Sequence, residues 1–140
     1  GVQTCALPIS FGTRKIIEAF TGKGVVIDEL YACGGLAQKS PFLLQVYADV
    51  TGRPIQVAAS EQTSALGAAM HAALAAGVHV DMHEAAEKMV RPSRAIYHPN
   101  RKHKPVYDQL YAEYTRLHDL LGRDPRSPLK VLKRLKTGRA

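Results

Sequence analysis

The sequence has few features of a membrane-spanning or secreted protein. No apolar run reaches the roughly 18 residues that a transmembrane helix needs. The first residues lack the basic start and the long apolar stretch of a secretory signal. The two cysteines among 140 residues, Cys5 and Cys33, follow no spacing rule for a disulfide framework. We therefore expect a protein of the reducing cytoplasm without a membrane partner, in which Cys33 is a small buried hydrophobe.

The positive charge is concentrated at one end of the chain. The net charge is +7, and residues 122–140 account for +6 of it, because they hold seven bases and one acid. No aromatic residue lies among these bases, so the stacking surface that single-stranded nucleic acids use is missing. A solvated helix end is the simpler interpretation of this basic tail. A contact with nucleic acid or another anionic partner is the alternative.

Short apolar runs alternate with helical patterns along the rest of the chain. With 46% apolar and 22% charged residues, the composition is that of a globular domain. Strands are expected at residues 25–27, 30–33 and 55–58, whereas residues 91–104 look irregular. The alternation predicts an α/β fold in which helices pack on a sheet. Because these strands are few for a whole α/β domain, we expect further strands to belong to sequence before this chain.

Helical patterns surround the expected strands. Ser40 and Pro41 supply an N-cap and a first helical residue, and Gly52 ends the helix that they begin. Residues 65–76 are almost free of polar groups, which predicts a helix that is buried or closely packed. Three more helices are expected at residues 13–20, 82–90 and 106–121, the last with an apolar face formed by Leu110, Tyr114, Leu117 and Leu121.

Two loops follow neighbouring strands of the predicted sheet. Gly34 and Gly35 come after the strand at residues 30–33, and residues 60–64 follow the strand at residues 55–58. Ligands of α/β proteins collect where strands end and helices begin, so we expect the two loops to frame one crevice. The glycines fit a turn that needs their backbone freedom, and they also fit a floor for a flat or phosphorylated ligand. The glycine loop matches neither a P-loop nor a G-x-G-x-x-G motif.

The histidines do not predict a metal centre. His79 and His83 have the i, i+4 spacing that two metal ligands on a helix can use. However, no glutamate lies between them as in H-E-x-x-H, and no third ligand is evident. We expect both to be surface residues, and we expect Glu61 to cap a helix rather than to act as a general base.

Three blocks of sequence, in the same order, resemble the C-terminal domain of the FGGY carbohydrate kinases. They read C-G-G-L-A-Q-K-S-P-F-L-L-Q-V-Y-A-D-V-T-G-R-P-I, S-E-Q-T-S-A-L-G-A-A-M and Y-D-Q-L-Y-A-E-Y-T-R-L-H-D. The resemblance covers residues 11–136, and its details are most similar to the ribulokinase branch of the family. It implies part of a ribonuclease-H-like lobe of the actin and hexokinase type, a sheet with packed helices.

In this family the second of two lobes binds ATP, and Mg²⁺ accompanies the nucleotide. The resemblance implies that Gly34 and Gly35 support the adenine and ribose. It also implies one polar contact to the nucleotide from the same loop, which Gln38, Lys39 or Ser40 could supply.

The resemblance further implies that residues 65–69 pack beneath the glycine loop, with Gly67 allowing a close approach. Packing between helices alone is an equally good explanation of Gly67. The complete protein would transfer phosphate from ATP to ribulose, or alternatively to xylulose or another ketose or polyol. The sugar and the catalytic aspartate belong to the first lobe, and no catalytic residue maps onto this chain. We therefore expect the chain to be inactive alone, and its long C-terminal helix is compatible with a homo-oligomer.

The beginning of the chain does not resemble the family. The first nine residues, G-V-Q-T-C-A-L-P-I, look like translated sequencing adapter, so residues 1–10 are expected to be a leader without function. A natural short N-terminal strand is the alternative. The kinase domain would then span residues 11–121, followed by the basic tail at residues 122–140.

Overall fold

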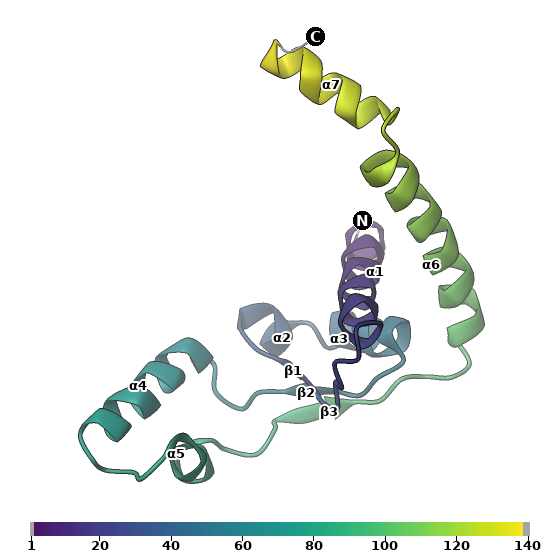
Figure 1. Cartoon of the computed structure of the whole chain (residues 1–140). Helices are drawn as coiled ribbons and strands as arrows, with labels where there is room; N and C mark the ends of the chain where they lie inside the picture. Colours follow the sequence, from purple (N-terminus) through teal and green to yellow (C-terminus); the bar gives the residue numbers. More distant parts are fainter. Residues whose placement is uncertain (1, 139–140) are drawn as a thin grey trace.

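A three-stranded sheet forms the centre of the structure. The computed structural model describes residues 2–138 of the chain. β1 (Leu30–Ala32) pairs in parallel with β2 (Ile55–Val57), and β2 pairs antiparallel with β3 (Ala95–Tyr97). Because β1 and β2 are parallel, their carboxyl ends meet at one edge of the sheet (Figure 1). The expected α/β arrangement of helices packed on a sheet is present.

The first core lies between the sheet and the helices that connect β1 to β2. These helices are α2 (Gly35–Lys39) and α3 (Pro41–Thr51). Proline at the first position begins α3, and Gly52 ends it in the left-handed conformation with a φ of 66°, both as expected. The buried side chains of this core are Ala37, Leu44, Ala48, Ile55 and Val57. Burial of the α3 face therefore fixes the crossover that keeps the two parallel strands together.

A second core joins α3 to two long helices, α1 (Val2–Thr21) and α6 (Lys104–His118). Its buried side chains are Phe11, Val46, Val50 and Tyr111. The ring centroids of Phe11 and Tyr111 lie 5.8 Å apart in a tilted arrangement that aromatic pairs favour. α1 and α6 thus depend on α3 for their position rather than on the sheet.

Polar contacts also join α1 to α6. The Arg14 guanidinium lies 4.1 Å from the ring centroid of Tyr111 and donates a hydrogen bond of 2.7 Å to Asp108. The Tyr111 hydroxyl donates to Glu18 at 2.5 Å. Burial, together with this hydrogen bond, raises the pKa of Tyr111 to about 12. The tyrosine is therefore a neutral donor throughout the ordinary pH range.

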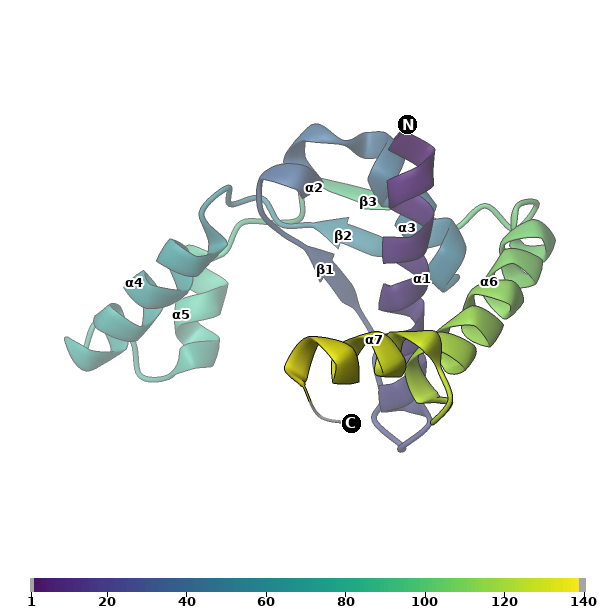
Figure 2. The same cartoon turned by 90° about the horizontal axis from the view of Figure 1, so that it is seen from above.

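Two helical segments extend away from the cores (Figures 1 and 2). α4 (Thr63–Ala75) packs against α5 (Met82–Met89) on one side of the molecule. On the other side, α6 continues through a π-helical turn, η1 (Asp119–Arg123), into α7 (Pro128–Thr137). Among the described residues, no helix is both long enough and apolar enough to cross a membrane.

The structure corrects three expectations about strands. Residues 25–27 form no strand. They belong to the irregular segment that precedes β1, and the Val26 side chain is 79% exposed. Residues 95–97, expected to be irregular, form β3 because β2 offers them a free edge. Cys33 lies just after β1 and is exposed rather than buried. Whether a segment forms a strand therefore depends more on a neighbouring strand with which it can pair than on its local apolar character.

Two helices differ from expectation in what they bury. α4 buries only Met70 among the described side chains, although its sequence predicts a buried or closely packed helix. Its neighbour in the structure is α5, and the two helices project away from the sheet, which therefore does not cover α4 (Figure 1). In α6 the buried residue is Tyr111, whereas Leu110 and Leu117 are 43% and 47% exposed. The aromatic stripe of α6, rather than its leucines, faces α1.

The first described residues of the chain are helical. Residues 2–9 form the first turns of α1, so the alternative of a short N-terminal strand is wrong. Pro8 lies inside this helix, where its ring removes a backbone donor at a cost of about 3 kcal/mol in an ordinary helix interior.

Val50 tests the second core. The Val50→Ala change should lower the free energy of unfolding by about 2 kcal/mol, because the side chain is 1% exposed and its loss leaves a cavity. Val26→Ala is the matched control and should change it by less than about 0.5 kcal/mol. Urea denaturation followed by circular dichroism measures both. Equal losses in the two variants would contradict the assignment of this core.

Asp108 tests the contact between α1 and α6 through its dependence on pH. Hydrogen bonds from Lys104 and then Arg14 lower the pKa of Asp108 below its ordinary value. A lowered folded-state pKa adds stability above the unfolded-state pKa of about 3.9, and this stability is lost as the pH falls through the folded-state pKa. Asp108→Asn should remove this contribution, which is below about 1 kcal/mol because the carboxylate is partly exposed. Unfolding at neutral pH and near pH 3 measures it; an unchanged acid dependence in the variant would contradict the contact.

Candidate functional site

The glycine loop exposes bare backbone at the carboxyl end of β1. Gly34 is the N-cap of α2 and has a φ of 87°, a conformation that side-chain-bearing residues rarely adopt. Gly35 has no positive φ and begins the helix. No atom lies within 4 Å of a Cβ added at either glycine. Gly34 is thus required by the turn, whereas Gly35 leaves open space that the turn alone does not demand.

The second loop lies beside the first. The Ala58 N–H, just after β2, donates a hydrogen bond of 3.0 Å to the Ala32 carbonyl at the end of β1. This bond continues the parallel pairing by one step beyond β2. The glycine loop and the loop that leads to α4 therefore leave the same edge of the sheet, as the sequence predicts.

The three polar candidates of the glycine loop have different environments. The stretch expected to be an open loop is the short helix α2, which contains Gln38 and Lys39. The Gln38 amide donates to the Ala58 carbonyl at 3.2 Å and accepts from Arg94 at 2.6 Å. Lys39 is exposed, and Ser40 makes no side-chain cap bond to α3. Gln38 is thus engaged within the protein, while the side chains of Lys39 and Ser40 have no hydrogen-bond partner among the described residues.

Gly67 lies beside the second loop. It lines a hollow of about 500 Å³ between the end of β2, the first half of α4 and the end of α5. The residues around this hollow include Ala58, Ser60, Thr63, Gly67, Arg91 and Ser93. No atom lies within 4 Å of a Cβ added at Gly67, so this side of α4 is open. The role of residues 65–69 beneath the glycine loop stays a prediction.

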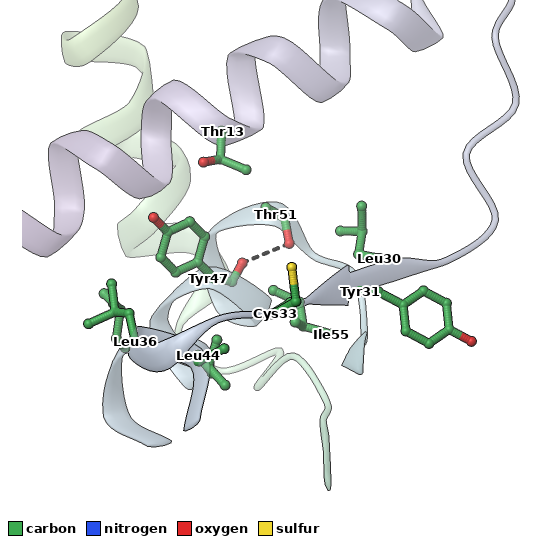
Figure 3. Close-up of a pocket in the computed structure, with 12 residues that line it drawn as sticks. Thr13, Leu30, Tyr31, Cys33, Leu36, Leu44, Tyr47, Thr51 and Ile55 are labelled. Carbon is green, nitrogen blue, oxygen red and sulfur yellow. Dashed lines mark hydrogen bonds between the residues drawn. The ribbon is translucent and has the colours of Figure 1, made fainter. Parts of the chain in front are cut away.

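A second, apolar hollow of about 270 Å³ lies along β1 (Figure 3). Thr13 of α1, Leu36 of α2 and Tyr47 of α3 face it across the strand, and Cys33 points into it. Cys33 and Leu36 flank the two glycines in the chain, so this hollow borders the glycine loop on its α1 side. Its lining can hold an apolar or aromatic group but offers few polar partners.

Charged groups near the loops do not form a metal centre. No group of three or more His, Cys, Asp or Glu side chains lies close enough to hold an ion in the described part of the chain. His83 is a surface residue that lies 3.4 Å from Glu87. The Tyr31 hydroxyl donates to Glu29 at 2.8 Å, and this bond raises the pKa of Tyr31.

Arg94 is the residue at this site that the sequence does not predict. Its backbone N–H donates to the Val57 carbonyl at 2.9 Å, and its guanidinium reaches Gln38. Gln38 lies 56 positions away in the chain, so no local pattern connects the two. The sequence pattern predicts only that the polar residues before β3 are irregular, and it assigns no role to Arg94.

Comparisons with known proteins place this arrangement in a family. The sequence profile of the "FGGY family of carbohydrate kinases, C-terminal domain" matches residues 3–76. Ribulokinase of Halalkalibacterium halodurans is 52% identical over 132 residues, which cover 91% of this chain and 23% of that protein. Ribulokinase of Geobacillus thermodenitrificans is 52% identical over 136 residues, covering 94% and 24%. The chain thus spans about a quarter of the length of the curated relatives that it matches.

Solved structures show the same fold. Xylulose kinase of Rhodospirillum rubrum superposes with a TM-score of 0.67 at 24% identity, over 82% of this chain and 23% of that one. Glycerol kinase of Plasmodium falciparum, solved with ADP, superposes with a TM-score of 0.66 at 19% identity, over 83% and 23%. These matches confirm the ribonuclease-H-like fold of sugar kinases for this part of the lobe. On the profile match and the extent of identity, the chain belongs to the FGGY family of carbohydrate kinases, within its C-terminal domain.

Proposed function

We propose that this chain supplies the ATP-binding side of a sugar kinase that phosphorylates ribulose in the cytoplasm. One observation carries the proposal: Gly34 and Gly35 leave uncovered backbone where two loops meet at the carboxyl ends of parallel strands. The names of the relatives and the three sequence blocks support ribulose as the acceptor. Xylulose or another ketose or polyol is the alternative sugar.

The open backbone suits an adenosine group. A side chain at Gly35 would occupy the space above the loop, whereas glycine lets a flat ring or a ribose approach the main chain. When bound, ATP would supply the phosphoryl group, and Mg²⁺ would arrive with its phosphates rather than in a site built by this chain. Lys39 or Ser40 remains the candidate for a polar contact, because Gln38 is engaged elsewhere.

The rest of the reaction belongs to other parts of the complete protein. We propose that the sugar and the catalytic base lie on the lobe that this chain does not include, so the chain alone transfers no phosphate. That residues 1–10 are a leader stays a proposal. Pro8 inside α1 favours it, whereas the profile match from residue 3 and the burial of Ala6 and Ser10 count against it.

A second candidate function is binding of an anionic partner through the basic tail. α7 carries Lys130, Lys133 and Arg134 around one shallow hollow, and it projects away from the sheet (Figure 1). Its opposite side shows exposed apolar residues, among them Leu132 and Leu135. The bases favour an electrostatic contact, but they lie far along the chain from the glycine loop.

Salt separates the two candidate functions. The affinity of the tail for a nucleic acid should fall at least tenfold between 50 and 200 mM salt. For six phosphate contacts the expected loss is about 10³-fold. ATP binding through backbone and apolar groups should change much less. Titrations of the complete kinase with a fluorescent oligonucleotide and with ATP measure both. An ATP affinity that collapses with salt as the oligonucleotide affinity does would contradict a glycine-loop site.

The two glycines can be separated by substitution in the complete kinase. Gly35→Ala should weaken ATP binding about tenfold or more, because its methyl group enters the space that the ligand needs. It should not lower the free energy of unfolding and should raise it by about 0.4–1 kcal/mol, because its backbone conformation suits alanine. Gly34→Ala should instead destabilise the fold by about 1–3 kcal/mol, because its φ is positive.

Calorimetry of ATP binding and urea denaturation give the two readouts, and assays with ribulose report the activity. Gly35→Ala with unchanged ATP affinity would contradict the proposed site. Gly34→Ala with unchanged stability would contradict the conformation of the turn.

A further inference from the structure

We propose that Gln38 and Arg94 form a clamp that positions the glycine loop, and that Gln38 acts as a positioning residue rather than as the contact to the nucleotide. The inference rests on the proposed function of the loop. It concerns residues from three segments of the chain: α2, the end of β2 and the entrance of β3.

Both ends of the Gln38 amide are engaged. The NH₂ group donates to the Ala58 carbonyl at 3.2 Å, and the amide oxygen accepts from the Arg94 guanidinium at 2.6 Å. A primary amide has two N–H donors and two oxygen lone pairs, so these two bonds use half of its capacity and fix the orientation of the whole amide group. The side chain therefore ties α2 to the loop that follows β2.

Arg94 completes the connection. Its backbone N–H donates to the Val57 carbonyl at 2.9 Å, which fixes the residue at the end of β2. From there its guanidinium reaches Gln38, and it also lies 3.9 Å from a carboxylate oxygen of Glu61 in the second loop. One arginine thus contacts both loops that frame the candidate site.

α2 has little else to hold it in place. It is five residues long, its N-cap makes no side-chain cap bond, and Ala37 is its only buried residue. Its first residue, Gly35, is the one whose open space is proposed to receive the ligand. Without the clamp, α2 could shift relative to β2 while the cores beneath it remain packed. The clamp should therefore affect nucleotide binding more than folding.

A double-mutant cycle in the complete kinase tests this inference. Gln38→Ala and Arg94→Ala should each raise the KM for ATP about three- to tenfold, the usual range for losing one such hydrogen bond. The KM for ribulose and the melting temperature should change little. The double variant should be no weaker than the weaker single variant, because both remove the same connection. Arg94→Lys, which keeps a donor, should recover part of the loss.

The control is Arg116→Ala, which removes an exposed arginine that pairs with Glu113 on α6, away from both loops. It should leave every readout unchanged. Additive effects of the two substitutions would overturn the clamp, since they would indicate that Gln38 acts on the nucleotide without Arg94. Unchanged ATP KM in both single variants would also overturn it. Failure of the proposed function would look different: the unmodified kinase itself would not bind ATP.

Discussion

The parallel pairing of β1 with β2 is the constraint on which the candidate site depends. It brings Ala32 and Ala58 side by side at the end of the two strands, joined by one backbone hydrogen bond. Two loops that are distant in sequence therefore begin at the same edge. α3 makes this pairing possible, because its buried residues Leu44 and Ala48 pack on β2 and close the crossover. The core between α3 and the sheet therefore supports the loops, while the backbone of Gly34 and Gly35 stays uncovered.

Much of this local architecture could be predicted from sequence, because its signals are local. Pro41 and Gly52 mark the ends of α3, and an apolar run between turn residues marks each of β1 and β2. The two glycines after a strand fit a turn and also a loop that a ligand can approach. The positive φ of Gly34 agrees with the turn, and the approach of a ligand to the open space at Gly35 stays a prediction.

Features that depend on distant partners could not be predicted in the same way. Residues 25–27 have the stronger local strand pattern, yet residues 95–97 are the segment that pairs with a free edge, on β2. α6 buries Tyr111 rather than its leucines because Arg14 and Phe11 of α1 offer that ring a cation and an aromatic partner. The hydrogen bond between Gln38 and Arg94 likewise joins residues 56 positions apart, so no local sequence pattern predicts it.

The most direct test of the account is a crystal structure of the complete kinase with a non-hydrolysable ATP analogue. The account predicts that the adenosine group lies in van der Waals contact with the backbone of Gly34 and Gly35, with the loop after β2 beside it. Gln38 should keep its bonds to Ala58 and Arg94 in that complex. A nucleotide bound away from the two glycines, with the space above them filled by protein, would contradict the account.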